Sequence, residues 1–149
     1  MPNIFDSTTS SDIFRRMEKL QPDSKALWGK MTVAQMLAHL MATFEIAMSE
    51  KKINRTFFGL LFGKMAKKKM MHEKPIDKNL PTDPSLVRNG EYNFEEERFK
   101  LSMAMHHLLS SGEAGLSKFP HPFFGKLTNE EWGVGLWKHI DHHFNQFGV

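Results

Sequence analysis

Two histidines near the end of the chain, His139 and His143, are spaced so that they could bind one metal ion. They lie four residues apart in a segment with helical periodicity, so their side chains sit one turn above the other, with Cβ atoms about 5–6 Å apart. Imidazole is a good ligand for Zn, Ni, Cu and Fe. The pair is weak on its own, because a chain with eight histidines can produce it by chance. A metal site therefore depends on a third ligand.

His39 is the candidate third ligand. It lies on a predicted helix that begins at Thr32 and runs to about Glu50, and the rise per residue places it about 16 Å from the Glu50 end. By the same rise, His139 lies about 16 Å from Thr128, where the last helix is expected to begin. Antiparallel packing of the two helices would bring three imidazoles to one level. Three neutral histidines leave a divalent ion with an open position, as in catalytic sites. The alternative is that each histidine is a hydrogen-bonded structural residue at the edge of the core.

The elements that would position these histidines are all predicted to be helices. Apolar residues recur with a period of about 3.6, and no alternating strand pattern is present. In the last helix they form one stripe: Leu136, Ile140, Phe144 and Phe147. Capping boxes open two of the helices, at Thr32 with Gln35 and at Thr128 with Glu131. We therefore predict one all-α domain over residues 1–149. Its helices are expected over residues 12–20, 32–50, 93 to 112 or 115, and 128–147.

Two segments lie outside this helical pattern. Residues 1–10 are expected to form a loose, polar N-terminal arm. Residues 75–92 contain three prolines and the pair Asn89-Gly90, so they are expected to form a long ordered loop. A structureless loop of this length in a compact domain is usually functional or wraps the surface.

Residues 56–71 are ambiguous, because apolar residues occupy all sides of the expected helix. The apolar cluster 57–62 is followed by Lys64 and by three consecutive lysines, 67–69. Such a helix could pack against the bundle or act as an amphipathic surface anchor, and burial against the bundle is the favoured interpretation. The wider stretch 51–74 is strongly basic, with Glu73 as its lone acid. A solvated helix face is favoured there over an anion-binding or membrane-attracting role.

The composition excludes several classes of protein. The chain contains no cysteine, so disulfides, thiolate nucleophiles and thiolate metal sites are absent. No apolar run is long enough for a membrane span, and no secretory signal is present, so a cytoplasmic location is expected. No nucleic-acid role is expected despite a pI near 9.2, since basic and aromatic residues are not interleaved. The zinc-protease motif is absent because Ile140 stands where its glutamate is required.

Four further side chains are candidates to support the site. Gln35 and Gln146 each lie about one turn from a candidate ligand, where they could hydrogen-bond a ligand histidine or the substrate. His121, between two prolines, could enter a pocket or cap its connector, and capping is favoured. Trp132 is a further candidate for the lining of the substrate pocket.

Two stretches resemble a known family. The segment Trp28-Gly-Lys-Met-Thr-Val-Ala-Gln-Met-Leu-Ala-His39-Leu resembles the W-(S/T)-x-x-(E/Q)-x-L-x-H-L segment of the DinB-like, or YfiT-like, superfamily. Residues 121–132 and 139–147 look like the closing connector and helix of that family, and the match is closest to a subgroup of small uncharacterised DinB-like proteins. The resemblance covers roughly residues 26–149 and is thin between 51 and 92. It implies a four-helix bundle of the up-down-down-up type, with a short additional helix and a long loop. It also implies a divalent metal (Zn, Ni or Mn) held by His39, His139 and His143.

The resemblance also implies a reaction class. Characterised relatives are metal-dependent transferases of low-molecular-weight thiols, thiol-dependent isomerases or hydrolases. A metal-dependent enzyme that activates a small thiol or water against a small-molecule substrate is therefore expected, and any thiol must come from outside this cysteine-free chain. The alternative is a non-catalytic helical bundle, with a binding or stress-associated role, in which the apolar and Lys-rich region contacts partners. A homodimer is compatible with the resemblance.

Overall fold

The computed structural model describes residues 1–50 and 52–149, and within them every regular element is a helix. Lys51, the first residue of the predicted basic stretch, lies outside the described residues. An isolated antiparallel bridge joins His121 and Gly125. The all-α class predicted from the sequence is confirmed. The elements are α1 (Ser7–Met17), α2 (Val33–Ala47), α3 (Phe57–Met70), the 3-10 helix η1 (Pro84–Leu86), α4 (Phe94–Ser111), the 3-10 helix η2 (Gly112–Gly115) and α5 (Asn129–Gln146).

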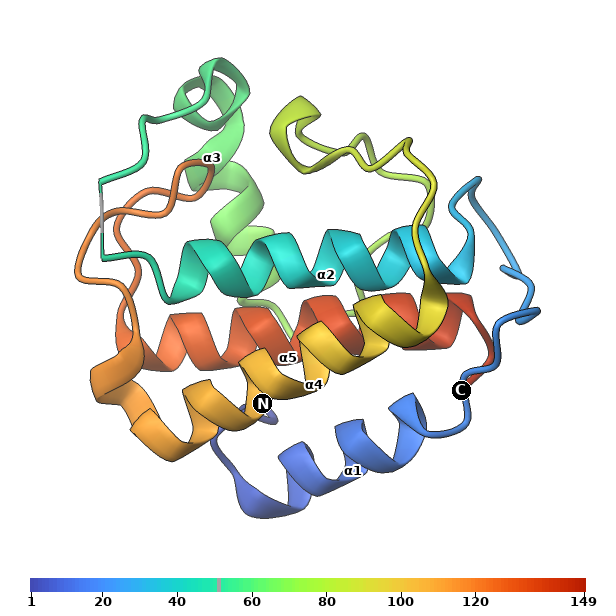
Figure 1. Cartoon of the computed structure of the whole chain (residues 1–149). Coiled ribbons are helices and arrows are strands. Elements are labelled where there is room, and N and C mark those ends of the chain that lie inside the picture. Colours follow the sequence, from blue (N-terminus) through green and yellow to red (C-terminus); the bar gives the residue numbers. More distant parts are fainter. Residues whose placement is uncertain (51) are drawn as a thin grey trace.

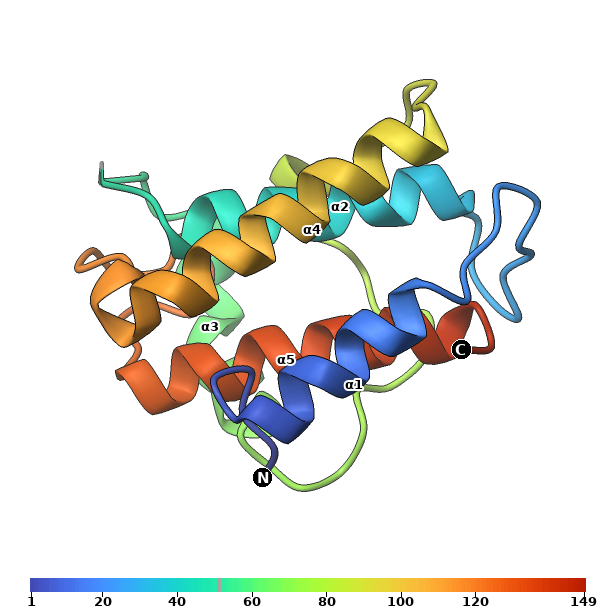
Figure 2. The same cartoon turned by 60° about the horizontal axis from the view of Figure 1, so that its bottom comes forward.

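Helices α1, α2, α4 and α5 lie in two layers. Figure 2 shows α2 beside α4 in one layer and α1 beside α5 in the other, and α2 also packs against α5. In Figure 1, α1 and α5 run in one direction and α2 and α4 run in the opposite one. The two helices that carry the candidate ligands, α2 and α5, are therefore antiparallel. This is the direction in which His39 and His139 can lie at the same level.

The ends of the two ligand-bearing helices are fixed by their own side chains. Thr32 accepts a hydrogen bond from the backbone N–H of Gln35, and the Gln35 side chain accepts one from the backbone N–H of Thr32. Thr128 and Glu131 form the same reciprocal pair at the start of α5. Both predicted capping boxes are present. Each satisfies two N–H groups that a helix start would otherwise leave unpaired.

The core fills the space between the two layers. In α5 the predicted apolar stripe is buried, and Ile140 and Phe144 are completely enclosed. Met36, Leu37, Leu40 and Phe44 of α2 and Leu101, Met105 and Leu108 of α4 are also completely enclosed. These positions follow the helical period, so burial of one stripe per helix fixes the rotation of α2 and α5. That rotation brings the histidines on the two helices toward each other.

The prediction of a loose arm over residues 1–10 is wrong. Ile4 is fully buried, and its backbone N–H donates to the carbonyl of Gly133 at 3.2 Å. Helix α1 begins at Ser7, five residues before the expected start at Asp12. Two adjacent apolar residues, Ile4 and Phe5, carry no periodic signal. The burial of Ile4 also depends on α5, which lies more than a hundred residues away in sequence.

The favoured burial of residues 56–71 against the bundle is also wrong. Only Gly59 and Gly63 of α3 are buried, and a Cβ added at Gly59 would lie 2.7 Å from the Phe123 backbone. The glycines let the helix backbone approach the connector that leads into α5 (residues 119–127), and the large apolar side chains therefore face outward. No helix in the described part of the chain is long and apolar enough to cross a membrane.

We expect Gly63→Ala to loosen α3. The new methyl group would meet the backbone carbonyl of Phe123, and overpacking of this kind costs about 1–3 kcal/mol. A gain of about 1 kcal/mol in helix propensity opposes that loss. The net result should be faster hydrogen exchange in α3 and a lower melting temperature. Lys64→Ala, at an exposed position of the same helix, is the control and should change neither. Equal behaviour of the two variants would contradict the close backbone contact.

Candidate metal centre

The three histidines expected from the sequence converge in the structure. Nε2 of His139 lies 3.0 Å from Nε2 of His39 and 3.0 Å from Nε2 of His143. Of the described residues, these three form a group that could hold a metal ion, with their candidate ligand atoms all within 4.8 Å of one another. Helix α2 supplies one ring and α5 supplies two, a turn apart. His39 and His143 are buried and His139 is partly buried.

Burial keeps these imidazoles in the neutral form that metal coordination requires. Loss of hydration is the main reason that the pKa of His39 lies below its usual value, and the nearby charge of Arg88 lowers it further. The same cause lowers the pKa of His143 to about 3. The pKa of His139 lies well below its usual value, first through desolvation and then through repulsion from His143 and His39. A cation competes with few protons at such a site.

Hydrogen bonds on the outer side of two rings determine which nitrogen carries the proton. His39 Nδ1 lies 2.9 Å from the carbonyl oxygen of Leu86, and His143 Nδ1 lies 2.8 Å from Oε1 of Gln146. Carbonyl oxygens only accept, so each Nδ1 must be the N–H donor. The Nε2 atoms of both rings are then unprotonated, with their lone pairs directed at His139. This is the orientation that outer hydrogen-bond partners impose on metal-binding histidines.

The orientation of the Gln146 amide is itself fixed. Its Nε2 donates to the backbone carbonyl of Trp28 at 2.7 Å, which leaves Oε1 facing His143. The chain can come this close because Gly29 follows Trp28 with a φ of +80°, and a Cβ at Gly29 would lie 2.6 Å from Nε2 of Gln146. The predicted role of Gln146 as a partner of a ligand histidine therefore has a geometric basis.

The protons of the protein cannot satisfy all the contacts among the three rings. His39 and His143 each present a lone pair to His139 Nε2, which carries at most one proton and can donate it to only one of them. A cation among the three nitrogens would satisfy every lone pair at once. Ligand nitrogens of a tetrahedral zinc with bonds of about 2.0–2.1 Å lie about 3.3–3.4 Å apart, near the 3.0 Å contacts observed. The donor set therefore fits a divalent transition metal.

The long loop 75–92 forms one side of the site. Besides the Leu86 carbonyl, it brings Lys78, whose Nζ lies 4.3 Å from the centre of the Trp28 ring. It also brings Arg88, whose charge acts on His39. His142 packs against the Trp28 ring, with ring centres 5.7 Å apart, and forms a hydrogen bond to the backbone of Ile76 in the loop. The loop thus places positive charge beside the three histidines.

The other three predicted side chains, His121, Trp132 and Gln35, have structural roles near the site. His121 is buried and caps the connector, as expected, because its Nδ1 accepts from the backbone N–H groups of Phe123 and Phe124. Trp132 packs on the His121 ring, with ring centres 5.2 Å apart. In the described part of the chain, the hydrogen bonds of the Gln35 side chain go to Thr32 and to the Gly90 carbonyl. None of these hydrogen bonds and ring contacts involves His39, His139 or His143, so the three side chains support the framework around the ligand group. Of the three, His121 is near enough for its charge to lower the pKa of His139.

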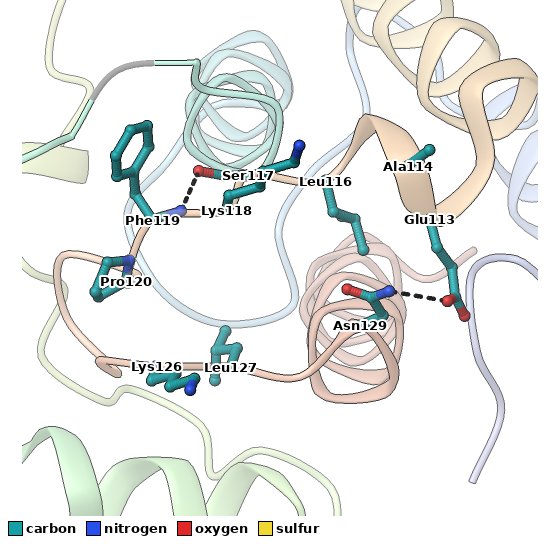
Figure 3. Close-up of a pocket in the computed structure, with 10 residues that line it drawn as sticks. All are labelled: Glu113, Ala114, Leu116, Ser117, Lys118, Phe119, Pro120, Lys126, Leu127 and Asn129. Carbon is teal, nitrogen blue, oxygen red and sulfur yellow. Dashed lines mark hydrogen bonds between the residues drawn. The ribbon is translucent and has the colours of Figure 1, made fainter.

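A separate hollow of about 640 Å³ lies where η2, the connector and the start of α5 meet. Figure 3 shows its lining residues, which include Glu113, Leu116, Lys118, Lys126 and Asn129 but none of the three histidines. Asn129 donates to Glu113 across it at 3.0 Å. Asn129 and Glu113 are thus already paired with each other, and the hollow brings together no group of metal-ligating side chains comparable to the histidine cluster among the described residues.

The fold and the site together define an all-helical protein with a three-histidine cluster suited to a metal ion. Residues 4–148 match the family described as "Protein of unknown function (DUF1569)", and the chain belongs to that family. No curated protein and no solved structure matches the chain.

Several residues around the site carry no sequence signal. The partner of His39 is the backbone carbonyl of Leu86, and the partner of Gln146 is the backbone carbonyl of Trp28. Any residue type offers such a carbonyl, so neither could be predicted by residue identity. The length of the loop 75–92 was the only indication that it contributes to a site. Gly29, directly after a tryptophan and before a capping box, could have suggested a close backbone approach.

His121 leads to a prediction about acid stability. Burial, followed by the charge of Arg55, lowers its pKa to about 4. The unfolded chain takes up the proton first, near pH 6.5, so the stability that neutral His121 provides is complete above about pH 6.5 and is lost as the pH falls to about 4. Urea unfolding of chelator-treated protein should show the advantage of wild type over His121→Gln shrinking by up to about 3 kcal/mol between pH 7 and pH 4.

The exposed His107 of α4 provides the control. His107→Gln should leave the pH profile of the wild type unchanged. If the difference between wild type and His121→Gln is the same at pH 7 and pH 4, the buried neutral His121 is not the cause of the acid sensitivity.

Proposed function

We propose that this chain is a metal-dependent enzyme in which His39, His139 and His143 hold a divalent ion, Zn, Ni or Mn. Water or a small external thiol would be the nucleophile and a small molecule the substrate. One observation supports the proposal. Nε2 of His39 and Nε2 of His143 are unprotonated, because the proton of each ring is on Nδ1, and both face Nε2 of His139 at 3.0 Å. Such an arrangement of neutral imidazoles is electrostatically unfavourable without a cation, and burial makes it more so.

The fold proposed with this function is the up-down-down-up bundle of the DinB-like superfamily, with α1, α2, α4 and α5 as its four helices. The helix directions in Figure 1 support it. So does the location of the site, because both segments that resemble the superfamily contribute to it. The first contains the Trp28 carbonyl and His39, and the second contains His139, His143 and Gln146.

A metal held by three neutral ligands lowers the pKa of a water or thiol at its open position and so supplies a nucleophile near neutral pH. The chain contributes the orientation of the ligands, through Leu86 and Gln146, and the exclusion of water by burial of His39 and His143. These contributions account for a site that is assembled before substrate arrives.

The surroundings favour a negatively charged substrate. Lys78 and Arg88 approach the site from the loop, and three neutral histidines leave the full charge of a divalent ion uncompensated. The indole N–H of Trp28 is buried and has no hydrogen-bond partner in the described part of the chain. A carboxylate or similar anion on the substrate could pair with these groups, since a buried donor without a partner is unfavourable.

Metal analysis tests the proposal directly. Protein purified and then loaded with Zn²⁺ should retain one ion per chain after desalting, and His39→Ala, His139→Ala and His143→Ala should each retain far less. His107→Ala, which removes an exposed histidine of α4, should bind like the wild type. Plasma mass spectrometry gives the stoichiometry, and circular dichroism establishes that each variant is folded.

The same preparations separate the enzyme from the non-catalytic alternative. Thiol conjugation and hydrolysis of small anionic electrophiles should require the metal-loaded wild type. Full turnover by His139→Ala would sink the enzyme hypothesis. A wild-type chain that is fully folded and takes up no Zn²⁺, Ni²⁺ or Mn²⁺ would favour the non-catalytic helical bundle.

Gln146 should tune metal affinity without binding the metal. Gln146→Leu removes the acceptor of His143 Nδ1 and leaves the Trp28 carbonyl unpaired. Loss of such an outer partner weakens metal binding by about 10–100-fold, which isothermal titration with Zn²⁺ can measure. The neighbouring Asn145, which is exposed, provides the control, and Asn145→Ala should bind Zn²⁺ as the wild type does. Unchanged affinity in Gln146→Leu would mean that His143 is held by packing alone.

A further inference from the structure

Helix α3 exposes an unusual amount of apolar surface. Six of its large apolar side chains are between 47% and 68% exposed. They occupy the first nine positions of the helix. We call this group the α3 apolar tip: Phe57, Phe58, Leu60, Leu61, Phe62 and Met65. Exposed patches of contiguous large apolar residues on a folded protein mark interaction sites more often than chance.

The tip is held outward by a rigid attachment on the opposite side of the helix. Gly59 and Gly63 lie against the Pro122–Phe123 backbone. Arg55 fastens the same contact, with Nε donating to the Pro122 carbonyl at 3.0 Å and Nη2 to the Phe123 carbonyl at 3.1 Å. In Figure 1 the start of α3 projects beyond α2. The side of α3 that faces the protein is already occupied, so the tip is not available to complete the core.

Lysines extend the apolar stripes toward the end of the helix. Phe57, Leu61, Lys64 and Lys68 follow the spacing i, i+4, i+7, i+11 and so lie on one stripe. Phe58, Phe62, Met65 and Lys69 form a second stripe with the same spacing. Each stripe begins apolar and ends in lysine; Lys64 and Lys68 are exposed, and Lys69 is ion-paired with Asp77. The outer face is therefore apolar at one end and basic at the other.

We propose that α3 is a peripheral membrane contact that binds anionic lipid surfaces. Aromatic and aliphatic side chains of such a helix enter the boundary between headgroups and acyl chains, and lysines remain at the level of the phosphates. The order of residues in both stripes matches this division over about 16 Å of helix from Phe57 to Lys68. This membrane contact does not involve the histidine cluster. It would place the reaction of the cluster at a membrane surface.

The charges of the same stripes disfavour a second copy of the chain as the partner. In a symmetric parallel pairing of α3 helices the apolar tips would meet, but Lys64 and Lys68 would face their counterparts at close range. In an antiparallel pairing the lysines would lie on the apolar tip of the other helix. An anionic surface with an apolar interior complements both ends of the helix simultaneously, and neither pairing does.

Vesicle flotation with the full chain tests the proposal. The protein should float with vesicles of phosphatidylcholine and phosphatidylglycerol (7:3) and bind pure phosphatidylcholine weakly, with the difference reduced in high salt. The double substitution Phe58→Ser with Leu61→Ser should reduce binding about tenfold or more. Lys64→Glu with Lys68→Glu should do the same, since each lysine near an anionic surface contributes roughly a fivefold factor.

Matched controls separate this surface from general effects. Phe99→Ser with Met103→Ser removes exposed apolar residues from α4, where they are 66% and 53% exposed. Lys19→Glu with Lys25→Glu makes the same change in net charge at exposed positions elsewhere. Both controls should bind as the wild type does. Melting curves establish that the variants are folded, and the lysine pair decides the matter if the serine pair fails to fold.

Three outcomes would overturn the proposal. The wild type could fail to float with anionic vesicles, or the control pairs could lose binding as strongly as the α3 pairs. The third is a dimer in analytical ultracentrifugation that Phe58→Ser with Leu61→Ser abolishes, because the tip would then be an interface between copies.

Discussion

The site depends on how the protons of three imidazoles are shared. Leu86 and Gln146 each accept an Nδ1–H, and this forces two unprotonated nitrogens toward the third ring. Most of the surrounding architecture serves that arrangement. Antiparallel packing of α2 and α5 sets the level of the rings, and the buried stripes set their rotation. The Trp28–Gly29 turn fixes the amide on which His143 depends.

The contacts of the loop 75–92 explain why a compact domain contains so long a segment with only one short turn of 3-10 helix. It contributes a backbone acceptor to His39, a hydrogen bond to His142 through Ile76, and the charges of Lys78 and Arg88. A helix in this position would have committed its carbonyl groups to its own backbone. Leu86 is the last residue of the short helix η1, so its carbonyl lies beyond the helical hydrogen bonds and accepts from His39 Nδ1.

The sequence predicts the features of this protein that rest on local rules. The capping boxes at Thr32 and Thr128, the apolar stripe of α5 and the level of His39 follow from spacing, and the structure agrees with each. The failures concern contacts between distant segments. Ile4 is buried by α5, and α3 turns its glycines inward because the connector approaches its backbone closely. A helix that is apolar on all sides gives no signal for which face is buried. The backbone acceptors at Trp28 and Leu86 are invisible to any rule based on side chains.

His39 and His139 are a hundred positions apart in the chain, and this separation has a thermodynamic meaning beyond the site itself. Ligands this far apart come together only in the folded chain, because gathering them in the unfolded chain would cost the entropy of closing a very long loop. The ion would therefore hold α2 and α5 together across the whole domain. Its free concentration would then set how firmly the entire bundle is closed, because a ligand that binds only the folded state stabilises it by mass action.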